Sequence, residues 1–352
     1  MSPSKSRPQS ELRPLTEEDF EGYERANQPE APITLGLISN PMAENNWRSV
    51  GHEQLVPLMP DPTLALSTPA IDDLEWALDY LLYQRKVNVL AINGGDGTIH
   101  HTLNAAIKAT RHGGRNLPIP TFLFLNGGGM NMVARAYDTR GYPKRTLRRF
   151  CRTLSGQCLG NLSTQEATLL RIRESTGDTR VGFIFGSELV HNALTMYERF
   201  GRGYRGLSRF FAEVTRAYLF KGPLWRTFGH LIVPPSHQLT IDDRAPIPYA
   251  AVVASTLPMT LLRGLVRTLP EASTAGFMQT IQVTARALPE LMRTIPYLLA
   301  GKDGPGFIKE DGLCRLELEG VYTLDGECFS RHRGRLEVDC YPVPIRGVRL
   351  GD

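Results

Sequence analysis

Residues 87–101 contain the feature that most constrains the fold of this chain. They read Val87-Asn-Val-Leu-Ala-Ile-Asn-Gly-Gly-Asp-Gly-Thr-Ile-His-His101. The apolar run up to Ile92 indicates a buried parallel strand, and the apolar spacing after Thr98 indicates a helix. The glycines between them allow a tight turn and a close approach of the backbone to a ligand. Because the N–H groups of a helix N-terminus favour anions, this unit predicts a phosphate site.

Asp96 lies within this glycine turn, where it would stand among phosphates. A carboxylate in that place can hold Mg²⁺ or accept a proton. An Asp-Gly pair can also mark nothing more than a loop. A run of glycines between a strand and a helix is more than a turn requires, however. We therefore take Asp96 as the first candidate for catalysis and for metal binding.

Length and composition predict a two-domain protein of ordinary polarity. The chain has 352 residues, of which 41% are hydrophobic and 22% charged, and single cores rarely grow beyond about 250–300 residues. No apolar run approaches the roughly 20 residues of a membrane span. Residues 1–30 are polar and lack the apolar core of a signal peptide, so we expect a disordered leader and a cytoplasmic protein. The five cysteines lack the spacing of a zinc site or a disulfide framework.

The charge pattern limits the expected partners. A net charge of +4 suits phosphate ligands or an anionic membrane surface and is too small to imply nucleic acid. Arginines alternate with aromatic residues in the helical stretch 188–221 and just beyond it. That pattern is typical of an amphipathic core face, and it also fits a surface that rests on a membrane.

The two halves of the chain differ in their pattern of predicted strands and helices. Residues 31–160 carry apolar strands at 33–38, 87–92 and 120–125, with a helix predicted to begin after Thr68, and therefore form a Rossmann-like α/β domain with a parallel sheet. A second glycine run, 127–129, follows the third strand, and the two glycine loops should face one crevice. Residues 161–352 carry short strands separated by turn signals, which predicts an antiparallel β-sandwich with helical insertions. We expect its last strands to return toward the first domain.

Three motifs carry a resemblance to a known family. Gly94-Gly95-Asp96-Gly97-Thr98 resembles the nucleotide-binding loop shared by diacylglycerol kinases, sphingosine kinases and NAD kinases. The stretch from Gly128 to Arg135 and the triplet Asp325-Gly326-Glu327 resemble the diacylglycerol and sphingosine kinases in particular. Asn40-Pro41 is similar to their first nucleotide-contacting turn. The resemblance covers nearly the whole chain after Ile33 and implies a first domain with the NAD kinase-like fold.

The resemblance also implies roles for single residues. Asp96 and Glu327 would serve catalysis and bind the metal, and Arg135 and Met132 would contact the substrate. The residues that would bind the nucleotide are Asn40, Gly94, Gly95, Gly97, Thr98, Gly127, Gly128, Gly129, Asn131 and Asp325.

The second glycine motif departs from the family pattern at two positions. Gly129 stands where threonine is usual, and Met132 stands where aspartate is usual. Polar groups of this kind fix the orientation of a ligand, so either the enzyme compensates for their replacement or its activity or acceptor is altered. The turn after Pro41 departs as well, which leaves Asn40 as the residue carried over there.

These observations predict an ATP-dependent and Mg²⁺-dependent lipid kinase. It would transfer the γ-phosphoryl group to the hydroxyl of diacylglycerol, a sphingoid base or ceramide in the cleft between the domains. The acceptor would be reached at a membrane surface with which the protein associates peripherally. The sequence is also compatible with a homodimer. One alternative is a lipid-binding or nucleotide-binding protein of the same fold with little or no turnover, and a second is a NAD kinase.

Overall fold

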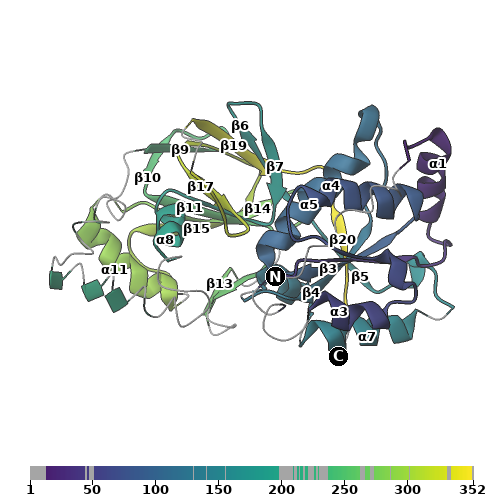
Figure 1. The fold of residues 1–352 in the computed structure, drawn as a ribbon. Helices are drawn as coiled ribbons and strands as arrows, with labels where there is room; N and C mark the ends of the chain where they lie inside the picture. Colours follow the sequence, from purple (N-terminus) through teal and green to yellow (C-terminus); the bar gives the residue numbers. More distant parts are fainter. Residues whose placement is uncertain are drawn as a thin grey trace.

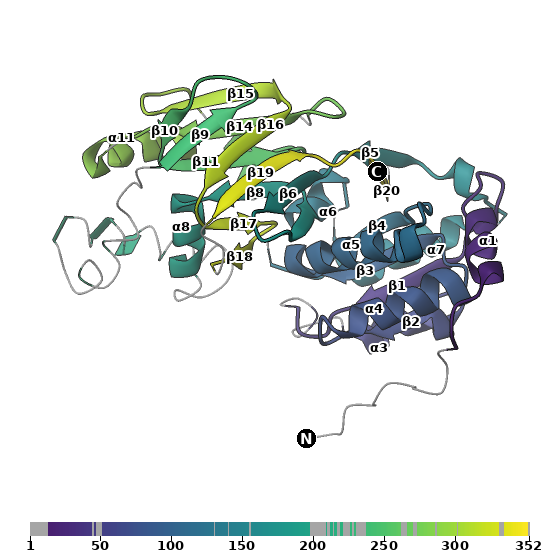
Figure 2. The same ribbon diagram turned by 90° about the horizontal axis from the view of Figure 1, so that it is seen from above.

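A computed structural model describes most of the chain after residue 12 (Figure 1). It covers residues 13–43, 46, 51–129, 131–139, 141–154, 156–197, 209, 212–213, 215–216, 219–220, 226, 229, 237–261, 266–269, 273–285, 287–300, 302–330 and 334–350. An α/β domain and a domain of antiparallel sheets lie side by side, as both ribbon views show (Figures 1 and 2). The predicted fold class is confirmed at this level.

The first domain is built on a six-stranded sheet in the order β2-β1-β3-β4-β20-β5. Its strands are β1 (Leu35–Ser39), β2 (Ala65–Ser67), β3 (Val89–Gly94), β4 (Thr121–Asn126), β5 (Thr164–Ala167) and β20 (Ile345–Val348). All pairings are parallel except that of β20 with β5. Every residue of β1 and β3 is buried. Burial on both faces explains why these strands are nearly continuous apolar runs in the sequence.

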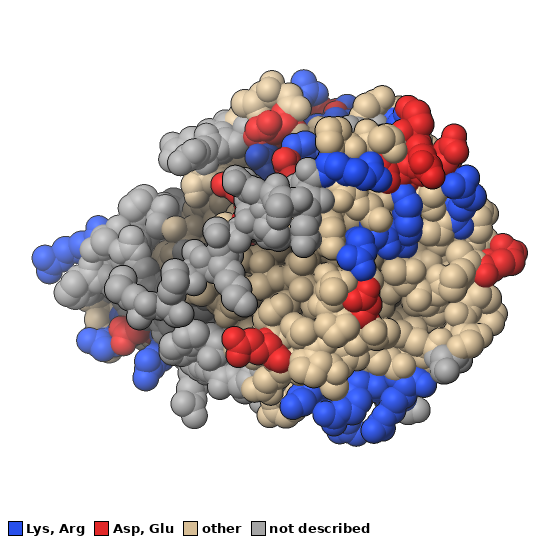
Figure 3. All heavy atoms as spheres, turned by 45° about the vertical axis from the view of Figure 1, so that its right-hand side comes forward, with Lys and Arg blue, Asp and Glu red and all other residues tan. Residues whose placement is uncertain are grey.

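Helices cover both faces of this sheet. One face packs against α1 (Glu17–Ala26), α4 (Asp73–Leu78), η3 (Asp79–Gln84), α5 (Asp96–Thr110) and α6 (Met132–Ala136). The other face packs against α3 (His52–Leu55), η1 (Val56–Leu58) and α7 (Pro143–Thr153). Three short turns complete the domain, η2 (Pro62–Leu64), η4 (His112–Gly114) and η5 (Leu159–Asn161). Figure 3 shows basic side chains gathered along its lower edge, the edge at which Figure 1 places α7.

The predicted disordered leader is wrong in its second half. Residues 1–12 lie outside the described residues, but residues 17–26 form α1, which packs on the first core. Phe20 and Tyr23 lie on one face of α1, and both rings meet Tyr83 edge-on at 5.0 and 5.3 Å. The Tyr23 hydroxyl donates to Pro118 O at 3.0 Å. Two aromatic residues at helical spacing therefore outweigh the polar composition of the segment.

The helix predicted after Thr68 begins later than expected. Thr68 N donates to Ser39 O at 2.9 Å, which extends the pairing of β2 with β1. Asp72 is the N-cap residue of α4, and α4 continues directly into η3. Thr68 thus closes a strand at the edge where the other parallel strands end.

Among the residues that the structure describes, the second domain contains two six-stranded antiparallel sheets, a two-stranded ribbon and two helices. One sheet has the order β10-β9-β16-β19-β6-β7, and the other has the order β15-β14-β11-β8-β17-β18. Apolar side chains from both sheets share one core, among them Ile172 and Val338 from the first and Phe185 and Tyr322 from the second.

The elements of this domain have the following bounds. The strands of the first sheet are β6 (Leu170–Glu174), β7 (Thr179–Gly182), β9 (His237–Ile241), β10 (Ile247–Tyr249), β16 (Arg315–Glu319) and β19 (Arg335–Cys340). The strands of the second are β8 (Ile184–Ser187), β11 (Ala251–Ser255), β14 (Met278–Val283), β15 (Phe307–Leu313), β17 (Tyr322–Leu324) and β18 (Glu327–Phe329). The ribbon is β12 (Met259–Leu261) with β13 (Val266–Leu269), and the helices are α8 (Leu189–Tyr197) and α11 (Leu288–Leu299).

The chain passes between the domains twice. It leaves the first sheet after β5 and returns to it as β20, which lies between β4 and β5. Most of the arginine and aromatic residues singled out between 199 and 226 lie outside the described residues. Among the helices that the structure does describe, none has the length and apolar character needed to cross a bilayer.

Replacing Tyr23 by alanine tests whether α1 belongs to the first domain. Loss of a fully buried aromatic side chain should lower the free energy of unfolding by about 3 kcal/mol or more. Glu24→Ala changes an exposed neighbour on the same helix and should stay within about 0.5 kcal/mol of the parent. Equal effects of the two variants in urea unfolding would show that α1 does not contribute to the core.

Candidate active site

The two glycine loops touch each other through their backbones. Gly127 N donates to Gly94 O at 3.1 Å. A Cβ atom on Gly127 would come within 2.7 Å of Gly94 N, and one on Gly128 would overlap the Cα atom of Gly95. The glycines are therefore required because two chain segments pass in contact at the carboxyl ends of β3 and β4. The two loops were predicted to face one crevice, and in the structure they are in direct contact at this edge of the sheet.

Asp96 joins the two loops through its carboxylate. It is the first residue of α5, and its Oδ2 and Oδ1 accept hydrogen bonds from Met132 N and Val133 N, both at 3.1 Å. These two N–H groups open α6, where a negative charge is favoured. Burial raises the pKa of Asp96 to about 6, although the two N–H donors and the charge of Arg135 act in the opposite direction. The group is thus placed to change its protonation near neutral pH.

Asn131 braces the second glycine loop. Its backbone is in the left-handed region, with φ of 50°, which asparagine tolerates better than most residues. Its Oδ1 accepts from Gly128 N at 2.8 Å, and its Nδ2 donates to Gly128 O at 2.7 Å. In this structure the side chain that was predicted to contact nucleotide holds the shape of the loop.

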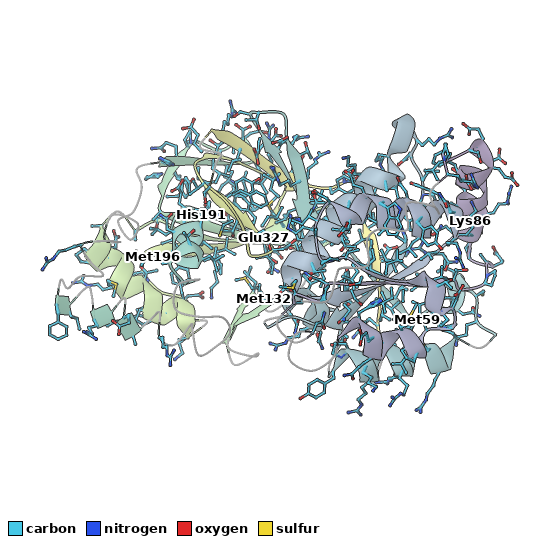
Figure 4. All side chains as sticks on the ribbon, viewed as in Figure 1. Met59, Lys86, Met132, His191, Met196 and Glu327 are labelled. Atoms are coloured by element: carbon cyan, nitrogen blue, oxygen red, sulfur yellow. The ribbon has the colours of Figure 1, made fainter. Side chains whose placement is uncertain are left out.

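The second domain contributes one hairpin to the site. Strands β17 and β18 are joined by Asp325 and Gly326, which have φ of 52° and 89° and form the tight two-residue turn typical of Asp-Gly. Glu327 follows, and its Oε1 lies so close to Gly97 that a Cβ atom there would overlap it. Glu327 Oε2 lies 3.8 Å from His101 Nε2. Figure 4 shows Glu327 and Met132 at the junction of the domains.

The Asp325 side chain points into the interior between the domains, whereas the Glu327 side chain reaches the first glycine loop. Asp325 Oδ1 accepts from Phe183 N at 2.9 Å and from Ile184 N at 3.0 Å. Its Oδ2 lies 3.2 Å from His100 Nδ1, and only 1% of its side chain is exposed. A nucleotide contact was predicted for Asp325, but in this structure both of its carboxylate oxygens have protein partners.

Asn40 supports the first glycine loop, beside a group of buried polar side chains. Its Nδ2 donates to Thr98 Oγ1 at 3.0 Å, and its Oδ1 accepts from Met42 N at 2.8 Å. The side chains of Ser39, Thr68 and Asn93 lie buried at the ends of β1, β2 and β3, and the structure gives them no hydrogen-bond partner among the described residues. Such atoms normally bond to ordered water or to a ligand. Their signal in the sequence is a polar residue at each strand end, where open α/β sheets bind ligands.

A cavity of about 190 Å³ opens next to α6. It is lined by Met132, Arg135, Ala136, Asp138 and Pro258. The first four residues belong to α6 and the turn after it, and Pro258 comes from the second domain, just before β12. Both residues predicted to contact the substrate, Met132 and Arg135, thus line the same space between the domains.

Two carboxylates are available for a divalent cation at this site. Asp96 and Glu327 offer the oxygen ligands that Mg²⁺ prefers. The part of the chain that the structure describes contains no group of three or more acidic, histidine or cysteine side chains that could enclose a metal. A Mg²⁺ ion would accordingly complete its coordination with phosphate oxygens and water, which is its usual behaviour with nucleotides.

Comparison with solved structures decides the fold. A protein from Bacillus anthracis str. Sterne that is provisionally assigned as a diacylglycerol kinase superposes with a TM-score of 0.59 and 15% identity, over 90% of this chain and 97% of its own. A diacylglycerol kinase structure from the same source gives a TM-score of 0.57 and 13% identity with the same coverage. This chain has the diacylglycerol kinase-like fold. The family resemblance predicted from three short motifs is confirmed at that level.

The diacylglycerol kinase-like fold is the extent of what this similarity establishes. No protein-family model matches the sequence, and no curated protein matches it significantly. At 13–15% identity the similarity does not assign an activity, since one fold supports many functions. The activity has to be argued from the residues of the site.

The raised pKa of Asp96 can be measured directly. In protein labelled with ¹³C at the aspartate carboxyl carbons, one resonance should titrate with a midpoint near pH 6, because burial favours the neutral acid. That resonance should be missing from Asp96→Asn. If every aspartate signal titrates below about pH 4.5, the ordinary range for this residue, then Asp96 is solvated and the geometry described here is incorrect.

Proposed function

We propose that the protein is a Mg²⁺-dependent lipid kinase that transfers the γ-phosphoryl group of ATP to a lipid hydroxyl. One observation carries the proposal: two carboxylates from different domains lie at the first turn of α5, beside the paired glycine loops. Asp96 is the first residue of that helix, and Glu327 lies against Gly97. Phosphoryl transfer needs positioning and charge stabilisation more than covalent chemistry. Backbone N–H groups at a helix start, two carboxylates and a metal meet that requirement.

The nucleotide is proposed to lie along the carboxyl ends of β1, β3 and β4. The residues between Gly94 and Thr98 would receive the phosphates, because the first turn of α5 presents N–H groups there. Gly127 and Gly128, which contact this loop, would border the same site together with Gly129. The buried polar group at Ser39, Thr68 and Asn93 supports this placement, since it supplies hydrogen-bonding capacity at the same edge.

Asp96 is proposed to act as the general base or through the metal. Each of its oxygens accepts one N–H from α6, which leaves a further lone pair on each for a hydroxyl proton or a cation. With a pKa of about 6, it is mostly ionised at neutral pH and still basic enough to take a proton. Glu327, 43% exposed, would face the phosphates from the second domain. Bound Mg²⁺ would neutralise charge on the phosphate oxygens.

The cavity beside α6 is the proposed entry of the acceptor. Its lining combines the apolar side chain of Met132 with the charged side chains of Arg135 and Asp138. Such a mixture suits an alcohol that carries a hydrocarbon chain. Diacylglycerol, a sphingoid base and ceramide each fit this description, and the residues do not separate them.

One observation favours the second candidate, a protein that binds ligand with little or no turnover. Met132, whose backbone N–H donates to Asp96, contributes an apolar side chain to the lining of the cavity. If turnover requires a polar group there, the chain binds lipid and nucleotide without transferring phosphate.

Phosphate transfer from γ-labelled ATP with Mg²⁺ to mixed micelles tests the proposal. Diacylglycerol, sphingosine, ceramide and free NAD should be offered separately. We expect label in one lipid, and a loss of at least about a hundredfold in kcat for both Asp96→Asn and Glu327→Gln, which is typical of the removal of a general base or a metal ligand.

Exposed Glu24→Ala serves as the matched control and should keep the parent rate. Label in NAD alone would establish a NAD kinase. No labelled acceptor, combined with measurable nucleotide binding, would establish the second candidate.

The lipid acceptor requires contact with a membrane, and α7 is the proposed contact. Residues 139–154 contain no acidic residue, and Arg145, Arg148, Arg149 and Arg152 are exposed. Tyr142, just before α7, is 69% exposed. The loop before it is held to the carboxyl end of β4 by Asn126 Nδ2, which donates to Thr139 O and Gly141 O at 2.8 and 3.1 Å. The basic face of α7 thus begins at the edge where the acceptor would enter, and we propose peripheral binding to the anionic cytoplasmic leaflet.

Sedimentation with vesicles that contain anionic lipid tests this contact. The double variant Arg145→Glu with Arg148→Glu should bind at least about tenfold more weakly, since each basic residue near the surface contributes about 1 kcal/mol. Arg25→Glu with Lys302→Glu alters net charge equally at two other exposed sites and should bind like the parent. Equal weakening by both pairs would show that net charge alone controls binding.

A further inference from the structure

One face of α5 carries three polar side chains, and two of them, His100 and Asn104, contact the second domain. Asp96, His100 and Asn104 follow one another at intervals of four residues, so they lie one above another on the helix. Asn104 pairs with the main chain of Val181 in both directions. Its Nδ2 donates to Val181 O at 2.7 Å, and its Oδ1 accepts from Val181 N at 2.9 Å. This face of α5 is therefore the seam between the domains.

His100 forms the middle contact of the seam. Its Nδ1 lies 3.2 Å from Asp325 Oδ2, and the two side chains are 3% and 1% exposed. Asp325 Oδ1 accepts two backbone hydrogen bonds, and Oδ2 accepts one from His100 in the tautomer that carries a proton on Nδ1. Asp325 N also donates to Ile184 O at 2.8 Å. Asp325 is thus fixed to its own domain through the main chain and to α5 through His100.

The contact reaches Glu327 through the hairpin. The His100 ring lies 6.1 Å from the ring of Phe329 and packs edge-on against His101 at 5.1 Å. His101 in turn faces Glu327 Oε2. Alternate residues of the hairpin, 325, 327 and 329, therefore all meet the first two turns of α5. A shift of the turn at Asp325 would move Glu327 away from Gly97.

We propose that His100 is a positioning residue for Glu327. Its hydrogen bond to Asp325 holds the turn between β17 and β18 against α5, and the turn places the Glu327 carboxylate beside the first glycine loop. This inference rests on the proposed function for the role of Glu327 in turnover. It assigns Asp325 to the support of the hairpin in place of a nucleotide contact. Loss of the donor would leave a buried carboxylate oxygen unsatisfied, which a protein relieves by shifting the chain.

Two substitutions at His100 separate the hydrogen bond from the packing. Leucine fills a similar space without a donor, whereas asparagine places an N–H donor close to the position of His100 Nδ1. We expect His100→Leu to lower kcat by about tenfold or more, because displacements of about 1 Å are costly in catalysis. KM for ATP should change by less than about twofold, because the glycine loops belong to the first domain. His100→Asn should recover most of the rate.

Amide hydrogen exchange of residues 325–329 provides a readout that does not need activity. Exchange should be faster in His100→Leu and close to the parent in His100→Asn. Asn104→Ala is the matched control, because it removes another contact of the same seam that does not touch the hairpin. It should leave the exchange of residues 325–329 and kcat unchanged.

The outcomes distinguish this inference from the proposed function. If no lipid is phosphorylated by the parent protein, the proposed function fails, and the exchange data still test the hairpin contact. If His100→Leu retains both the parent kcat and the parent exchange rates, the inference is overturned. A fall in melting temperature alone, with the kcat of an active parent unchanged, would show that His100 is a packing residue and would also overturn it.

Discussion

The hydrogen bonds from the start of α6 to the Asp96 carboxylate are the interaction on which the site depends. They join the first turn of α5 to the first turn of α6, and so hold together two loops that come from different strands. The glycines allow the loop backbones to touch, and Asn131 fixes the shape of the second loop. The partial burial of this carboxylate raises its pKa. The two hydrogen bonds that join the loops act against this rise in pKa and do not cancel it.

Helix α5 belongs to the first domain, and the second domain packs against it. This contact explains how a hairpin far along the chain reaches the glycine loops. Asn104 and His100 bind the second domain, and Glu327 approaches the helix start. Strand β20 returns from the second domain to the first sheet, so two chain segments connect the domains. The proposed site is therefore assembled from residues more than two hundred positions apart, each held by an element that also has a packing role.

The parallel strands and glycine loops could be predicted from the sequence, because residues buried on both sides leave continuous apolar runs that end in glycines. Glu327 was reached only through the family resemblance, since Asp-Gly-Glu alone is compatible with an ordinary hairpin. Three features could not be predicted. Helix α1 depends on Phe20 and Tyr23 meeting Tyr83, which is a contact over about sixty residues. Likewise, the burial of Thr68 and the pairing of His100 with Asp325 arise from tertiary contacts that no local pattern records.

A crystal structure with Mg²⁺ and a non-hydrolysable ATP analogue tests the central claim most directly. The account predicts phosphates over residues 94–98, with the metal coordinated by oxygens of Asp96 or Glu327. It also predicts that Asp325 keeps its contacts with His100, Phe183 and Ile184. Nucleotide bound elsewhere, or metal held by neither carboxylate, would contradict the claim that the junction of α5 with the β17–β18 hairpin is the site of phosphoryl transfer.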